Sequence, residues 1–160
     1  AKAYLFRGVE IRWKCDKELL GNNSKTPKSV TLHFPNGLAD YLAAALDSRP
    51  TVNAECFAAE VALPKDKGRV EWALSWPADS DGFISSYVNT VPTPGGGTHE
   101  LGLRNALTKG LRDYGQRIKE RRTSQITAED VSGSAATVLS VFLRDPQFQL
   151  LQKMNFLMKI

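Results

Sequence analysis

The chain has 160 residues, of which 42% are hydrophobic and 24% are charged. These fractions match ordinary globular domains, so they exclude a disordered tail, a collagen-like fibre and a low-complexity segment. The longest apolar run, residues 41–46, is far shorter than the roughly 20 residues that cross a bilayer, so we expect no membrane span. Two isolated cysteines and two histidines argue against a disulfide framework or a metal site and favour a cytoplasmic setting.

The first 34 residues predict a β-hairpin with a long loop. Residues 4–15 alternate in part between apolar and polar side chains, with an irregularity at Gly8, and residues 29–34 form the second strand. The residues between these strands include the Asn, Ser, Gly and Pro that are typical of connectors. The chain begins with Ala1 in place of an initiator methionine, which suggests a fragment.

The remaining pattern alternates helices with groups of strands, an α+β order. Apolar residues at helical spacing predict a helix over residues 38–46, ending before Pro50. Residues 56–63, 69–76 and 83–88 read as consecutive antiparallel strands, and residues 136–143 read as one more strand. Between them lies a helix over residues 98–121 and a short helix opened by a capping box at Thr127. The long helix should bury one face, formed by Leu103, Leu107, Leu111, Tyr114 and Ile118.

Three glycines, residues 95–97, precede the long helix and resemble a phosphate cradle, because a helix N-terminus offers unpaired N–H groups to an anion. No P-loop pattern accompanies them, and Glu100 already places a negative charge in the first turn. Plain turn chemistry with Thr98 as the N-cap is therefore the favoured interpretation. No group of residues in the chain forms a catalytic motif.

The long helix and its exit are basic, with seven Lys and Arg residues against two acidic residues between residues 104 and 122. Arg104, Lys109 and Arg112 are the candidate phosphate-binding residues. The pattern is equally consistent with the solvated face of an amphipathic helix. No aromatic residues interleave the basic ones, so base stacking is not expected.

Residues 85–99, with the sequence Ser-Ser-Tyr-Val-Asn-Thr-Val-Pro-Thr-Pro-Gly-Gly-Gly-Thr-His, resemble the gyrase B/topoisomerase IV B family. Gly102-Leu103-Arg104 and Asp145-Pro146-Gln147-Phe148 continue the match in the family's order, and the likeness is closer to topoisomerase IV than to gyrase. The resemblance implies that residues 35–160 are the transducer domain, a ribosomal S5 domain 2-like layer whose mixed sheet carries helices on one face. Residues 1–34 then resemble the closing strands of a GHKL ATPase domain.

The resemblance also implies a function, which is to couple ATP binding and hydrolysis to gate closure and DNA strand passage. Lys153 and Gln152 align with a loop that touches the terminal phosphate of ATP, although Leu151 and Gln152 stand where the family has Gln and Thr. Arg104 aligns with a cavity through which duplex DNA passes. The implied cofactors are ATP and Mg²⁺, held by the full-length protein. Its implied partners are duplex DNA, the A subunit of topoisomerase IV and a second copy of the B subunit.

This chain alone is expected neither to hydrolyse ATP nor to cut DNA, because the nucleotide-holding and metal-binding motifs of the family are absent from it. Two other readings stay open. One is the transducer of the gyrase B protein, and the other is a non-enzymatic, basic nucleic-acid-binding module. Such a module would bind nucleic acid tightly as an isolated domain, whereas a transducer cavity would bind weakly alone.

Overall fold

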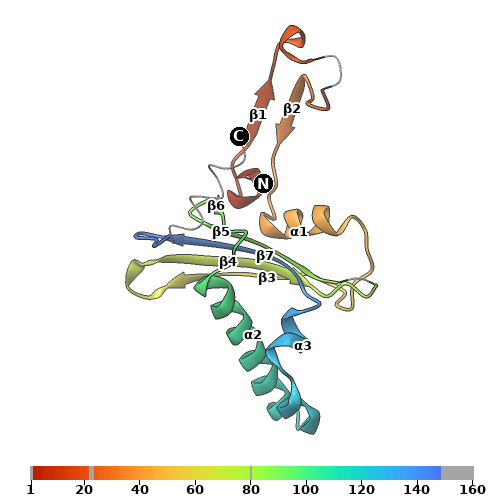
Figure 1. Cartoon of the computed structure of the whole chain (residues 1–160), viewed down its shortest axis with the longest axis vertical. Helices are drawn as coiled ribbons and strands as arrows, with labels where there is room; N and C mark the ends of the chain where they lie inside the picture. Colours follow the sequence, from red (N-terminus) through yellow and green to blue (C-terminus); the bar gives the residue numbers. More distant parts are fainter. Residues whose placement is uncertain (1, 22–23, 80, 149–160) are drawn as a thin grey trace.

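The computed structural model describes residues 2–21, 24–79 and 81–148 of the chain. A β-hairpin rises from an α+β layer, as Figure 1 shows. This arrangement confirms the predicted α+β fold class. No helix among the described residues is long and apolar enough to cross a membrane.

The N-terminal part consists of short elements with little core of their own. A 3₁₀ turn, η1 (Lys2–Leu5), precedes β1 (Ile11–Lys14), which pairs with β2 (Ser29–Leu32) in antiparallel register, and η2 (Lys17–Leu19) lies in the loop. The hairpin is confirmed, but its first strand begins later than the alternation suggested, because Leu5 turns inward and is almost fully buried. The side chains of Ile11 and Trp13 on β1 are more than one third exposed.

A five-stranded mixed sheet forms the body of the described chain, in the order β3-β4-β7-β5-β6. Its strands are β3 (Phe57–Leu63), β4 (Gly68–Ser75), β5 (Phe83–Val88), β6 (Val91–Pro92) and β7 (Ala136–Leu143). The helices are α1 (Leu38–Leu46), α2 (Thr98–Arg117) and α3 (Ala128–Ser132), and the 3₁₀ turns are η3 (Pro64–Asp66) and η4 (Arg121–Gln125). The capping box that opens α3 at Thr127 is confirmed, since Asp130 and Thr127 exchange hydrogen bonds.

The pairing of β5 corrects one expectation. The strands β3 and β4 are antiparallel neighbours as predicted, but β5 pairs in parallel with β7 instead of with β4. The chain enters β7 only after α2 and α3, and β7 then inserts between β4 and β5. Alternation along a strand identifies its two faces but not its neighbour, so the sequence pattern could not reveal this insertion.

The helices cover both faces of the sheet, so the predicted placement of helices on one face is wrong. Along β7, Val138 packs with Leu38 and Leu42 of α1, while Leu139 packs on the opposite face near Leu103 of α2. Figure 1 shows α1 on the side of the hairpin and α2 with α3 on the other side. Successive residues of a strand point to opposite faces, and β7 is apolar at both parities, so each face requires a cover.

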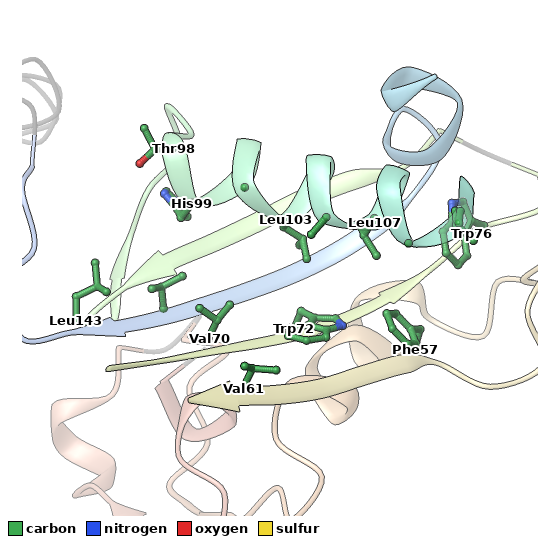
Figure 2. Close-up of a pocket in the computed structure, with 15 residues that line it drawn as sticks. Phe57, Val61, Val70, Trp72, Trp76, Thr98, His99, Leu103, Leu107 and Leu143 are labelled. Atoms are coloured by element: carbon green, nitrogen blue, oxygen red, sulfur yellow. The ribbon is translucent and has the colours of Figure 1, made fainter. Parts of the chain in front are cut away.

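The helix α2 lies loosely against its face of the sheet, which corrects the expectation of one continuous buried stripe. Leu103 and Leu107 point toward the sheet, but Leu111, Tyr114 and Ile118 are 37%, 56% and 57% exposed. An apolar groove of about 920 Å³ separates α2 from β3 and β4, and Trp72 lines its floor (Figure 2). The helical period located the apolar side correctly, but it could not show how much of that side the described residues cover.

The helix α1 is packed closely on the sheet and α2 is not, so substitutions in the two helices should change the stability by different amounts. The substitution Leu42→Ala removes a side chain that is 1% exposed, so it should lower the free energy of unfolding by about 2–5 kcal/mol. Leu111→Ala, at the same kind of apolar helix position, should cost less than about 1 kcal/mol because that side chain is already in contact with water. Urea unfolding of both variants measures the difference, and equal losses would show that α2 packs closely in solution.

Candidate nucleic-acid interface

Two of the three predicted phosphate-binding residues, Lys109 and Arg112, lie on the side of α2 that faces away from the apolar groove, whereas Arg104 lies beside the sheet. Residues three and four apart share one side of a helix, so Gly102, Leu103, Ala106 and Leu107 turn toward the groove together. Lys109 and Arg112 instead line a shallow hollow with Asn105 and Asp113. α2 therefore separates an apolar side from a cationic side.

Arg104 and Lys109 keep their charges available. The side chain of Arg104 lines a hollow of about 280 Å³ between α2 and the sheet, together with Glu100 and Glu129. No ion pair within 4.0 Å joins Arg104 or Lys109 to a carboxylate in the part of the chain that the structure describes. Lys109 is exposed and Arg104 is half-buried. Neither cation would have to break a salt bridge to meet a phosphate, but a phosphate at Arg104 would also face the carboxylates of Glu100 and Glu129, which line the same hollow.

Arg112 has a structural contact that competes with phosphate binding. Its Nε donates a hydrogen bond of 2.8 Å to the carbonyl oxygen of Ile126, and its Nη2 donates to the same oxygen. These bonds join α2 to the segment that leads into α3. The guanidinium can still attract an anion by its charge, but its donors are partly occupied.

The positive charge of the residues that follow α2 is also partly neutralised. Arg122 donates to the carboxylate of Glu120, with 3.1 Å between Nε and Oε1. This hydrogen bond lowers the pKa of Glu120 and raises the pKa of Arg122. Besides Arg104, the cations of the row with no ion pair to a described carboxylate are Lys109, Arg112 and Arg117 on α2 and Lys119 and Arg121 at its exit.

The glycine-rich turn before α2 does not fit a phosphate. Ser86 donates to Oε1 of Glu100, and a Cβ at Gly96 would lie 2.9 Å from Oε2 of the same carboxylate. An incoming anion would therefore meet a negative charge at this helix N-terminus. Turn chemistry is the better reading, although Gly97 and not Thr98 is the N-cap.

Behind this turn a short polar chain links β5, the turn after β6 and the start of α2. His99 Nε2 lies 3.0 Å from Thr93 Oγ1, which lies 2.6 Å from Ser86 Oγ. Burial lowers the pKa of His99, which favours the neutral ring at neutral pH. The network fixes the start of α2 against β5, and so it fixes the direction in which the helix leaves the sheet.

Lys153 and Gln152, predicted at the terminal phosphate of ATP, lie outside the described residues. The structure does show how the chain leaves the sheet on the way to them. The side chain of Asn89 donates to the carbonyl of Leu143 at 2.8 Å and accepts from its N–H at 2.8 Å. Asn89 has a φ of 47°, in the left-handed region that Asn tolerates, so this turn residue extends the ladder of β7. Sequence reasoning used Asn89 only as part of a motif and missed this role.

Sequence comparisons connect the chain to known proteins. Residues 37–150 match the family described as DNA gyrase B. The chain is 48% identical over 153 residues to the B subunit of DNA topoisomerase 4 of Caulobacter vibrioides and 46% identical over 148 residues to the protein of that name from Bartonella bacilliformis. These alignments cover 93% and 92% of this chain but only 22% and 21% of the two relatives. The chain thus spans about a fifth of the length of these curated relatives.

Solved structures show the same architecture. The topoisomerase IV ATP binding domain of Francisella tularensis, in complex with a small-molecule inhibitor, has a TM-score of 0.70 at 28% identity. The match covers 92% of this chain and 37% of the Francisella tularensis chain. The 43K ATPase domain of Thermus thermophilus gyrase B, in complex with an aminocoumarin, has a TM-score of 0.76 at 23% identity, over 92% of this chain and 38% of its own, which shows a shared fold. Because the family match covers most of its length, the chain belongs to the DNA gyrase B family, and within that family it is similar to the B subunits of DNA topoisomerase 4.

Proposed function

We propose that this chain is the transducer segment of the ATPase subunit of a type IIA DNA topoisomerase, where it couples ATP binding and hydrolysis to gate closure and DNA strand passage. The observation that carries the proposal is the similarity to the Francisella tularensis ATP binding domain, which extends over 92% of this chain and includes both the hairpin and the sheet. A segment that joins part of a nucleotide-binding domain to a second layer is suited to pass a movement between them.

The hairpin supports this assignment. A two-stranded hairpin is marginally stable in water by itself, and Val9, Ile11 and Trp13 expose 47%, 38% and 46% of their surface. Such residues fit the edge of a larger sheet in the complete protein. Residues 1–34 are accordingly assigned to the closing strands of the ATPase domain, and residues 35–160 to the transducer domain.

The nucleotide contacts belong to the complete protein. The described residues offer no cradle for ATP, since the glycine-rich turn carries the Glu100 carboxylate, so this chain alone should be inactive. In the complete protein, ATP with Mg²⁺ would supply the phosphate whose presence Lys153, with Gln152 beside it, detects. A charge-assisted hydrogen bond contributes roughly 1.5–3 kcal/mol, whereas reversing a two-state gate from 1:99 to 99:1 takes about 5.5 kcal/mol. Contacts between two copies of the B subunit must supply the difference.

DNA would be held through its phosphates. Arg104, beside the sheet, and Lys109, on the outer side of α2, provide cations that no described carboxylate pairs, and Arg112 adds charge beside Lys109. The basic side carries no aromatic platform for bases, so binding should be independent of sequence and sensitive to salt. Together with the A subunit of topoisomerase IV, which would hold the duplex to be cut, this surface would guide the captured duplex.

Removal of the proposed phosphate sensor should strongly slow ATP turnover. In the full-length protein, Lys153→Ala should lower the rate of ATP hydrolysis by about 10- to 100-fold, the kinetic equivalent of one charge-assisted hydrogen bond. Lys159→Ala, at a lysine six residues further along, is the matched control and should keep the parental rate. Unchanged turnover in Lys153→Ala, with an unchanged melting temperature, would show that Lys153 does not sense the nucleotide.

Removal of the two available cations should affect DNA transport and spare the basal ATPase. With the A subunit present, Arg104→Ala combined with Lys109→Ala should slow ATP-dependent strand passage about tenfold and reduce the slope of log affinity for duplex DNA against log salt by about 2. Basal ATP hydrolysis should stay within about twofold of the parent. Lys67→Ala, at an exposed lysine beside η3, is the control.

Equal losses of strand passage and basal hydrolysis in the double variant would contradict this role for the basic side. A separate binding experiment tests the simpler alternative, which is a nucleic-acid-binding module without a motor. In that case the isolated 160-residue chain would bind duplex DNA tightly at physiological salt.

A further inference from the structure

A buried carboxylate on the sheet receives its counter-charge from the N-terminal segment of the chain. The side chain of Glu71 on β4 is 5% exposed, and its Oε1 lies 2.7 Å from Nη2 of Arg7. Arg7 follows η1 and precedes β1, so the pair joins the base of the hairpin to the sheet. Within the part of the chain that the structure describes, Arg7 is the one cation within 4.0 Å of Glu71.

A second carboxylate makes this cation necessary. Glu60 on β3 stands directly opposite Glu71 in the antiparallel register, and like charges in that position repel each other. Nη2 of Arg7 also lies 3.6 Å from Oε2 of Glu60 and so bridges both carboxylates. Arg69 reaches Glu60 at 3.7 Å, and its guanidinium also lies over the ring of Phe142. Loss of Arg7 would therefore leave the buried carboxyl of Glu71 without a cation and facing another carboxylate.

The path of Arg7 is fixed by its surroundings. Its side chain crosses Gly37, where a Cβ would lie 2.7 Å from Cγ of Arg7. Gly37 has a φ of +59°, a conformation that side-chain-bearing residues rarely adopt. The sequence before α1 is thus shaped to let the arginine reach the sheet.

Neighbouring residues hold the same segment at further points. Leu5 is 1% exposed in the core that α1 forms with the sheet. The ring of Tyr4 stacks on Phe34 with 3.7 Å between centroids and on Tyr41 with 5.0 Å. The hydroxyl of Tyr41 meets that of Tyr87 on β5 at 2.9 Å. The base of the hairpin is therefore attached to α1, β4 and β5 together.

We propose that Arg7 is a positioning residue for coupling: by clamping Glu71 and Glu60 it makes residues 2–7 move as one body with the sheet. This inference rests on the proposed function of the segment. A movement of the ATPase domain that reaches β1 is then transmitted to the sheet and to α2, and is not absorbed by a flexible joint. The apolar contacts of Leu5 and Tyr4 hold the segment near the sheet, while the ion pair fixes its angle.

The number of strand passages for each ATP hydrolysed measures the coupling directly. In the full-length protein, together with the A subunit, the rates of strand passage and of ATP hydrolysis are measured for the parent and four variants. The variants are Arg7→Met, Arg7→Lys, Glu71→Gln and the double variant Arg7→Met with Glu71→Gln. Arg7→Met should lower the ratio by at least about fivefold, while ATP turnover stays within about twofold of the parent. Arg7→Lys keeps the charge and should restore most of the ratio. The double variant should have a ratio no lower than that of Glu71→Gln alone, because the carboxylate that needs the cation is gone in both.

Arg12→Met is the matched control, since Arg12 is exposed on β1 and pairs with the nearby Glu10. It should leave the ratio unchanged. An unchanged ratio in Arg7→Met, or an equal fall in the Arg12→Met control, overturns the inference while leaving the proposed function intact. Absence of ATP-dependent strand passage in the parent overturns the proposed function itself. If Arg7→Met does not fold, Glu71→Gln and Arg7→Lys decide: a parental ratio in Glu71→Gln together with a fallen ratio in Arg7→Lys would contradict the clamp.

Discussion

The strand β7 needs a cover on both of its faces, and the rest of the described chain is arranged around that need. Ala136 and Val138 pack beneath α1, and Leu139 and Val141 pack on the side of α2. β7 lies between β4 and β5, so it also supplies backbone hydrogen bonds to both halves of the sheet. Because α1 alone does not complete the first face, Leu5 from the N-terminal segment fills the same core. The hairpin is thereby anchored to the sheet by the same packing that stabilises it.

The two faces of the sheet consequently have different properties. The face under α1 holds a well-packed core, and at its edge lies the charged contact between Arg7, Glu60 and Glu71. The opposite face is open, because α2 leaves an apolar groove, and α2 carries Lys109 and Arg112 on the side away from that groove. A well-packed attachment at one face and a basic, loosely held helix at the other suit a segment that receives a movement and presents a surface to DNA.

Most elements could be predicted from the sequence, because each depends on local patterns. The strand of residues 136–143 and the helix of residues 38–46 match β7 and α1, and the capping box at Thr127 opens α3. Their arrangement could not be predicted in the same way. The parallel pairing of β5 with β7 depends on contacts between distant residues, and so does the split of the helices between two faces.

The candidate site was predictable only in part for the same reason. The basic composition of α2 pointed to Arg104, Lys109 and Arg112, but the hydrogen bonds from Arg112 to the Ile126 carbonyl depend on the fold. Likewise, nothing local to Glu71 signals an arginine more than sixty residues away, and its burial follows from the cover that α1 and the N-terminal segment provide.

The central claim is that residues 2–7 move as one body with the sheet and so carry the attached hairpin with them, and the two free cysteines allow this to be measured. Cys15 lies at the end of β1 and Cys56 lies just before β3, so one label falls on each side of the attachment. Burial raises the pKa of Cys56, so spin labelling is best carried out at alkaline pH. Double electron–electron resonance on the full-length protein, with its other cysteines replaced, gives the distance between the labels without nucleotide, with a non-hydrolysable ATP analogue and with ADP. We predict the same single distance in all three states. A distance that changes with the nucleotide would place a flexible joint between hairpin and sheet and would contradict the account.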